Sequence, residues 1–157
     1  MSGQQTQRVD HFGIAPELFQ PMLEQEKLLK ESGLDQSLIE LMRLRASQVN
    51  GCAYCINMHW QDARAHGEGE ERLCLLNAWR DASVYSEREA AALAWTEALT
   101  LIEASHAPDE VYAAVERHFS PREQVVLSLV ICAINAWNRI AIGFRMPHSL
   151  PGSAKAA

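Results

Sequence analysis

The fold of this chain is decided by residues 40–59, which read ELMRLRASQVNGCAYCINMH. An Asn-Gly pair precedes the first cysteine and predicts the end of one helix and the start of another. A helix turns about 100° per residue, so in a helix over 52–66 Cys55 lies about 60° from Cys52, and His59 about 20° from it. Two thiols and an imidazole therefore share one narrow helical face, directly after a helix break.

This face carries the groups that thiol redox chemistry requires. Because the thiolate rather than the thiol is the nucleophile, a helix N-terminus and a nearby imidazole both activate a cysteine. Cys52 lies at the predicted helix N-terminus, which favours ionisation of its thiol. In a C-x-x-C pair one sulfur attacks an oxidant and becomes a sulfenic acid, and the other condenses with it to a disulfide. The pattern predicts a catalytic pair, Cys52 and Cys55, supported by His59.

Glu40 lies on the preceding helix, predicted over 36–50. A tight Asn-Gly connection folds the two helices into a hairpin. The hairpin brings Glu40 toward His59, where its carboxylate can accept or relay the thiol proton. A second interpretation is equally open, because Glu40 follows Ser37 by three residues, as the glutamate of a helix-capping box does.

The rest of the chain predicts an all-α protein. Apolar residues recur at helical spacing and almost nothing alternates with period two. Two S-x-x-E capping boxes, beginning at Ser86 and Ser120, mark helix starts. Helices are expected at 16–32, 36–50, 52–66, 69–80, 86–105, 108–118 and 121–143. They form one domain over 1–157, with a core over about 15–145, an irregular arm at 1–15 and a flexible tail at 147–157.

Composition excludes several classes of protein. The 157 residues carry a net charge of -6, and no basic stripe marks a nucleic-acid surface. The first ten residues lack an apolar signal core. The longest apolar run, 125–136, is interrupted by Ser128 and Asn135, so no membrane span is expected. We expect a cytoplasmic protein, in which the four cysteines are redox-active, metal-binding or core residues rather than structural disulfides.

The spacing Glu40, eleven residues, Cys52, two residues, Cys55, three residues, His59 resembles the signature of the alkylhydroperoxidase D / carboxymuconolactone decarboxylase superfamily. The likeness covers about residues 15–145, and it is specific to the peroxidase-related branch over 43–55 and 87–95. The resemblance implies an all-α fold of the alkylhydroperoxidase D-like type, assembled as homotrimers or hexamers. It also implies reduction of a hydroperoxide substrate by the cysteine pair, without a cofactor or a metal.

By the same resemblance Cys55 is the peroxide-attacking thiol and Cys52 the resolving thiol. His59 takes the proton from Cys55, and Glu40 completes the relay. The helix-end reasoning points instead to Cys52 as the more readily ionised thiol, so the order of attack stays open. The best-studied branch has a histidine where this chain has Tyr54, which leaves the relay details and the reductant open. The expected reductant is a dithiol on a lipoyl-bearing or thioredoxin-like protein.

Three other functions stay open on the sequence. Cys52, Cys55 and His59 are also three candidate zinc ligands, with His66 or Cys74 as a fourth, although no second C-x-x-C or histidine pair is present. A decarboxylase-type lyase would need cationic residues for its substrate carboxylates, and no Arg/Lys cluster near the motif indicates one. The third is a helical oligomer whose cysteines sense oxidants without turnover.

Other chemically distinctive residues receive structural roles. Cys74 and Cys132 lie in apolar segments and are expected in the core, because a free cysteine behaves as a small hydrophobe. Arg43 and Ser47 follow Glu40 at helical spacing, and they either share its face or serve hairpin packing. Core or subunit contacts are expected for Trp79, Trp95 and Trp137, and surface or capping roles for His11, His66, His106, His118 and His148.

Overall fold

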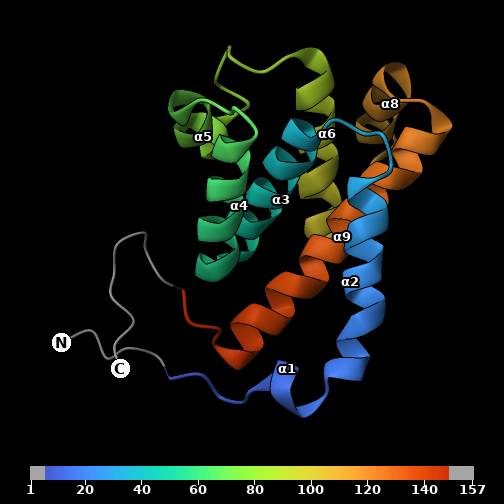
Figure 1. The fold of residues 1–157 in the computed structure, drawn as a ribbon. Coiled ribbons are helices and arrows are strands. Elements are labelled where there is room, and N and C mark those ends of the chain that lie inside the picture. Colours follow the sequence, from blue (N-terminus) through green and yellow to red (C-terminus); the bar gives the residue numbers. More distant parts are fainter. Residues whose placement is uncertain (1–5, 149–157) are drawn as a thin grey trace.

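The structure is a computed structural model that describes residues 6–148, and within that range every regular element is a helix. The prediction of an all-α fold is confirmed. Figure 1 shows the elements along the chain. Their bounds are α1 His11–Ile14, α2 Pro16–Lys30, α3 Gln36–Asn50, α4 Ala53–Ala65, α5 Glu70–Leu75, the 3-10 turn η1 Leu76–Ala78, α6 Glu87–Thr100, α7 Ile102–Ser105, α8 Asp109–His118 and α9 Pro121–Phe144.

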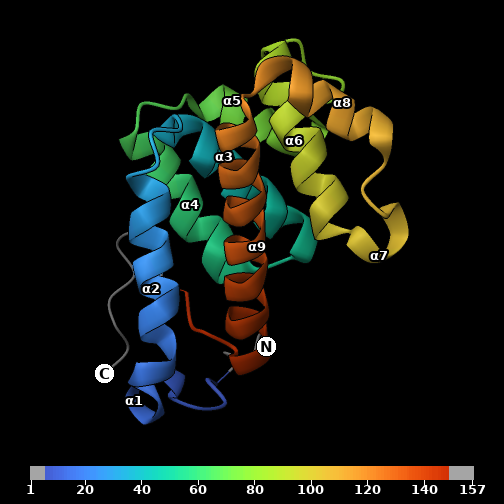
Figure 2. The ribbon, with the colours of Figure 1, turned by 90° about the vertical axis from the view of Figure 1, so that its right-hand side faces the viewer.

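The central helix is α3, which packs against α4, α6 and α9. Figure 2 shows α9 running through the middle of the molecule, with α2 on one side and α6 on the other. The short α1 leads into α2, and α2 lies along α9 at the outer edge. The hairpin of α3 and α4 that the Asn-Gly pair predicts is present, and α9 contacts both of its helices.

Local signals set several helix ends where the sequence predicts them. Ser86 and Ser120 each accept a hydrogen bond from the backbone N–H of the glutamate three residues on, and that glutamate accepts one in return. Gly51 ends α3 in the left-handed region with φ of 70°, a conformation that costs a residue with a Cβ atom about 1–2 kcal/mol. Cys52 then caps α4, so the chain reverses within two residues.

Most of α3 is buried. Nine of its fifteen residues are buried, and Ile39, Leu41 and Leu44 are at most 1% exposed. Its apolar residues belong to three core clusters, one of which includes the cysteine pair. Full burial of a side chain of this size contributes about 1.5–3 kcal/mol. A helix this deep also requires partners inside the protein for its polar residues, Glu40 and Arg43.

The N-terminal arm expected at 1–15 is not wholly irregular. It contains α1, which begins where the Asp10 carboxylate accepts the backbone N–H of Gly13 at 3.0 Å. The Arg8 backbone N–H donates to the carbonyl of Phe144, which ties this segment to the end of α9. Most of the tail expected at 147–157 lies outside the described residues.

Two predicted helices are shorter than expected. The segment 69–80 is helical only as α5 and then tightens into the 3-10 turn η1. The helix expected over 86–105 breaks at Leu101 into α6 and α7. At the break the Ser105 hydroxyl donates to the Ala98 carbonyl at 2.5 Å. A side chain thus satisfies an oxygen that a continuous helix would pair with backbone.

By length and composition the whole of α9, of which the run 125–136 is a part, is long and apolar enough to cross a membrane. The reason is that α9 is one uninterrupted helix through Ser128 and Asn135. It packs against α2, α3 and α6, and it carries the fully buried Asn138, which donates to the Ser47 hydroxyl at 3.0 Å. Core helices pass the same test, so this one helix is weak evidence for a membrane span.

The two cysteines outside the motif are exposed, so the prediction that they lie in the core is wrong. In α5 the helix turns Leu73 toward the core and Cys74 toward solvent. In α9 it turns Ile131 inward and Cys132 outward. Both segments are apolar on more than one face, and composition alone does not say which face is covered.

Aromatic side chains gather where α1 meets α2 and α9. His11 is 5% exposed, which contradicts its expected surface or capping role. Its ring stacks on Phe144 and contacts Phe19, and neither ring nitrogen has a hydrogen-bond partner among the described residues. Trp79 and Trp95 are buried as expected, whereas Trp137 is half-buried and lines a cavity described below.

Candidate active site

The turn between α3 and α4 positions the cysteine pair. Cys52 is the N-cap residue of α4, as predicted, and its sulfur accepts a hydrogen bond from the Cys55 backbone N–H at 3.3 Å. The two sulfurs are joined in a disulfide, with the Cα atoms 5.3 Å apart. Both side chains are buried. The structure therefore holds the pair in its oxidised form.

Glu40 on α3 faces His59 on α4 across the hairpin. Glu40 Oε2 lies 2.7 Å from His59 Nδ1, and both side chains are almost fully buried. Asp35 caps α3, accepting the backbone N–H of Ser37, so the capping interpretation of Glu40 is wrong. With a carboxylate at Nδ1, the ring keeps Nε2 as the nitrogen that can accept a proton.

Two further charged residues, Arg43 and Glu26, extend this pair of side chains, and the sequence analysis named only Arg43. Arg43 shares the face of Glu40 and donates to its Oε1 atom at 3.0 Å. The guanidinium also donates to Glu26 of α2. Glu26 in turn accepts the indole N–H of Trp137 at 3.0 Å. The last two contacts join different helices, so no periodic signal in the sequence marks them.

The pKa of Glu40 lies below its usual range. Burial alone acts to raise it, because burial penalises the charged carboxylate. The hydrogen bond and charge of His59, together with the charge and hydrogen bond of Arg43, outweigh burial. Glu40 is therefore an anion at neutral pH. The imidazole of His59 therefore faces a carboxylate anion.

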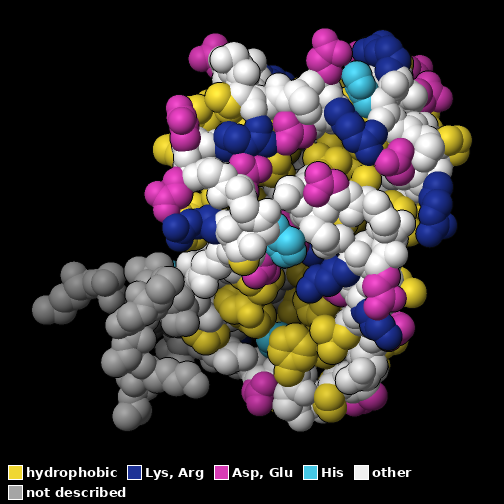
Figure 3. Space-filling model, turned by 45° about the horizontal axis from the view of Figure 1, so that its top comes forward, with side chains coloured by type: hydrophobic (Ala, Val, Ile, Leu, Met, Phe, Trp, Pro, Cys, Tyr) yellow, Lys and Arg dark blue, Asp and Glu magenta, His cyan; other side chains and the backbone are white. Residues whose placement is uncertain are grey.

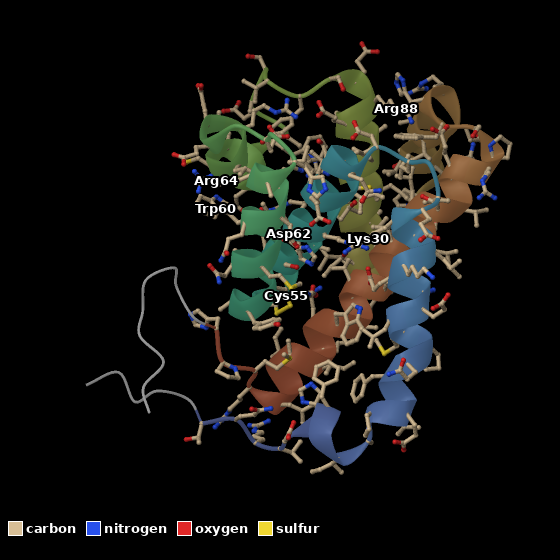
Figure 4. All side chains as sticks on the ribbon, viewed as in Figure 1. Lys30, Cys55, Trp60, Asp62, Arg64 and Arg88 are labelled. Atoms are coloured by element: carbon tan, nitrogen blue, oxygen red, sulfur yellow. A yellow bond between two sulfur atoms is a disulfide. The ribbon has the colours of Figure 1, made fainter. Side chains whose placement is uncertain are left out.

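A cavity of about 280 Å³ opens beside the cysteine pair. Cys55 and His59 line it, whereas Cys52 does not. Lys30 on α2 and Asp62 on α4 also line the cavity, and in Figure 4 both lie above Cys55, with Lys30 to the right of Asp62. Figure 3 shows hydrophobic side chains gathered in a hollow on one face of the molecule. The apolar part of the cavity wall includes Phe12, Leu23, Met58, Ile134, Trp137 and Met146.

A network of partly and fully buried polar side chains holds the turn that carries Cys52. The Asn50 side chain donates to Asn135 at 2.9 Å and to Asn138 at 2.8 Å, both on α9. Asn138 donates to the Ser47 hydroxyl at 3.0 Å, and the Ser47 carbonyl accepts the Cys52 backbone N–H at 3.0 Å. Through these contacts α9 fixes the position of the first cysteine.

A metal site fits this arrangement less well. Among the described residues, Glu40, His59 and Asp62 each offer one ligand atom, and these atoms lie within 4.8 Å of one another. Asp62 is exposed, and Arg43 already neutralises Glu40. The group includes neither cysteine of the motif and neither of the fourth ligands that the zinc interpretation requires. The donor set suits proton transfer better than a metal centre.

Comparisons with known proteins agree with the fold and with the superfamily that the motif resembles. The model of the carboxymuconolactone decarboxylase family matches residues 16–98. YdfG of Bacillus subtilis (strain 168), itself uncharacterised, is 45% identical over 137 residues, which cover 87% of this chain and 93% of YdfG. The chain therefore belongs to the carboxymuconolactone decarboxylase family.

Solved structures with the same fold include proteins described as AhpD-like. ATU0492 of Agrobacterium tumefaciens, a protein of unknown function regarded as a candidate AhpD antioxidant defence protein, is 40% identical with a TM-score of 0.90. The match covers 92% of this chain and 99% of ATU0492. A peroxidase-related protein with an AhpD core from Ralstonia eutropha JMP134 shares the fold at 18% identity, with a TM-score of 0.77 over 88% of this chain and 74% of that protein.

Proposed function

We propose that this protein is a thiol-dependent peroxidase that reduces hydroperoxides with the Cys52–Cys55 pair. The position of Cys55 carries the proposal. It lines the cavity together with His59, whose ring contacts the anionic Glu40. Cys52, which does not line the cavity, is bonded to Cys55 in a disulfide. The four residues supply a nucleophile, a resolving thiol, a proton acceptor and a support for that acceptor.

The cycle begins with the reduced pair. His59 accepts the Cys55 proton, and the thiolate attacks the terminal oxygen of the hydroperoxide. The O–O bond breaks, the alkoxide takes the proton from His59 and leaves as an alcohol, and Cys55 becomes a sulfenic acid. The Cys52 thiol then attacks the Cys55 sulfur. Water leaves and the disulfide forms, so the two thiols supply the two electrons that reduce the peroxide.

Access to the cavity favours Cys55 as the attacking thiol. The position of Cys52 at the helix N-terminus favours its ionisation, but Cys52 does not line the cavity, whereas Cys55 does. A nucleophile has to reach its substrate, so access outweighs ease of ionisation. Tyr54 lines the cavity where the best-studied branch has a histidine. His59 is therefore the histidine that the proposed relay uses in this chain, with Glu40 as its partner.

A dithiol restores the pair by thiol–disulfide exchange, and its own two thiols end as a disulfide. The carriers we propose are a lipoyl-bearing or a thioredoxin-like protein. Turnover of this kind requires a reducing compartment, so we place the protein in the cytoplasm. We also propose a homotrimer or homohexamer. Val125, Leu129 and Ile142 leave apolar surface exposed on α9 that a second copy can cover.

A lyase that acts on a substrate with several carboxylates has less support. Arg43 lines the cavity, but its guanidinium is already paired with Glu26 and Glu40. Lys30 is the other cationic side chain that lines the cavity, and no ion pair is formed by it among the described residues. One free cation and mostly apolar walls suit a monofunctional apolar substrate better.

The test is consumption of a hydroperoxide by the pure protein with dihydrolipoamide as reductant. Cys55→Ser should abolish turnover, and Cys52→Ser should be oxidised once and then stall. Cys74→Ser, which removes an exposed thiol outside the cavity, is the matched control and should retain turnover. A wild-type rate no higher than that of Cys55→Ser would contradict the proposal. Metal analysis and a thiol count on the same sample separate it from the zinc interpretation.

A further inference from the structure

We propose that Glu26 is a positioning residue for the thiol relay. The negative charge of Glu26, acting through Arg43, lets His59 carry the proton that Cys55 gives up. The inference rests on the proposed peroxidase function and extends its machinery to α2, which the C-x-x-C motif does not include. The hydrogen bonds of the Glu26 side chain go to Arg43 and Trp137. Its effect on His59 is therefore electrostatic and indirect.

The charged side chains form one line of contacts. Glu26 accepts from Arg43, Arg43 donates to Glu40 at 3.0 Å, and Glu40 lies 2.7 Å from the His59 ring. The side chains of Arg43, Glu40 and His59 are 3–6% exposed, and that of Glu26 is 20% exposed. Charges at this depth act on one another with much less screening than charges at the surface.

The balance of charge explains why a second carboxylate matters. With His59 neutral, Glu26, Glu40 and Arg43 together carry one negative charge, so a proton on His59 makes the cluster neutral. Without Glu26, the charges of Glu40 and Arg43 already cancel, and the same proton leaves an uncompensated positive charge in a buried place. A buried uncompensated charge is strongly disfavoured. Glu26 therefore makes His59 a better proton acceptor.

The other groups that face His59 leave this balance intact. Asp62 from α4 has a carboxylate oxygen within 4.8 Å of ligand atoms of His59 and Glu40, and Lys30 from α2 lines the same cavity with the opposite charge. Both side chains are exposed to water, which screens their charges. The side chains that α1 and α9 contribute to the cavity are uncharged, namely Phe12, Ile134, Trp137 and Ala141. Glu26 is thus the carboxylate that sets the sign of the buried cluster.

Glu26 also supports the cavity wall through its bond to Trp137, and the two roles can be separated. Glu26→Gln keeps the size of the side chain and one acceptor oxygen, and removes the charge. Trp137→Phe removes the indole bond and keeps the charge. Glu24→Gln removes one negative charge from an exposed position on the same helix and is the matched control.

The experiment is an NMR titration of the His59 ring in the oxidised protein, which requires neither peroxide nor reductant. We expect Glu26→Gln to move the titration midpoint to lower pH by about one unit or more. Glu24→Gln and Trp137→Phe should leave the midpoint within a few tenths of a unit of wild type. The double variant Glu26→Gln/Arg43→Gln removes one charge of each sign and should return the midpoint toward wild type.

Three results would overturn the proposal: an unchanged midpoint in Glu26→Gln, an equal shift in Trp137→Phe, or a double variant shifted further than Glu26→Gln alone. The last result would mean that Arg43 and Glu26 act by holding Glu40 in place rather than by charge. Circular dichroism establishes that each variant is folded, and if Glu26→Gln is not, the double variant carries the test. Because no peroxide is present, failure of this coupling is distinguishable from failure of the peroxidase activity.

Discussion

Replacing Glu40 with glutamine tests the relay and the buried charges together. In the structure the two carboxylate oxygens of Glu40 contact Arg43 and His59 separately. A glutamine has one acceptor oxygen and an NH2 donor, so one of these partners is left facing a donor. A hydrogen bond to a charged group contributes about 1.5–3 kcal/mol. The isosteric change is therefore not neutral for folding, as it would be at a helix cap.

The stability cost follows from what remains around Arg43. Breaking a buried ion pair completely costs about 3–5 kcal/mol, but Glu26 still compensates Arg43 in this variant. We expect the free energy of unfolding to fall by about 2–3 kcal/mol at neutral pH. Because folding lowers the pKa of Glu40, its contribution is present above the pKa of an unfolded carboxyl group. The contribution is lost as the pH falls through the folded-state pKa, so variant and wild type should converge in acid.

Urea unfolding followed by circular dichroism, at neutral and at acidic pH, measures this difference. Glu24→Gln on the exposed face of α2 is the control and should change the stability by less than about 0.5 kcal/mol. A Glu40→Gln protein as stable as wild type at neutral pH would refute the assignment of the buried charges. So would a stability difference that persists unchanged in acid.

The same variant tests the relay through its activity. General-base contributions are typically on the order of a hundredfold or more. We expect peroxide turnover by Glu40→Gln to drop at least about tenfold, with partial recovery at higher pH, where the thiolate forms unaided. Wild-type turnover across the pH range would mean that Glu40 serves stability alone.

The remaining predictions concern the thiols, the assembly and the turn. Mild oxidation should form the disulfide of the C-x-x-C pair, while Cys74 and Cys132 stay reduced. Both should react quickly with an alkylating reagent because they are exposed. A disulfide between either of them and a cysteine of the pair, detected by mass mapping, would contradict this. Leu129→Glu on the exposed face of α9 should reduce the proposed oligomer to a monomer with unchanged helicity, and an unchanged mass by light scattering would count against it. Gly51→Ala should lower the stability by about 1–2 kcal/mol because the φ of Gly51 is 70°. Gly143→Ala is the control and should not lower the stability, because a Cβ atom at Gly143 meets open space. Equal melting temperatures of the two variants would contradict the prediction.

Helices and the shared face of the motif were predictable because their causes are local. The capping boxes at Ser86 and Ser120 are formed by residues three apart, and Gly51 ends α3 through its own φ. The shared face of Cys55 and His59 follows from helical spacing alone. The break at Leu101 was not predictable in this way, since no Gly or Pro marks it and a hydroxyl four residues on completes it.

The sequence by itself determined which residues share a helix face, because the period of the helix relates neighbours along the chain. Only the tertiary structure decided which faces are covered, and that choice exposes Cys74 and Cys132 and buries His11. It also decided the partners of Glu26, since Arg43 lies 17 residues beyond it and Trp137 lies 111 residues beyond it. No spacing rule connects residues so far apart. They meet because α2 and α9 pack side by side next to the hairpin, which places buried charges where each must find an opposite charge.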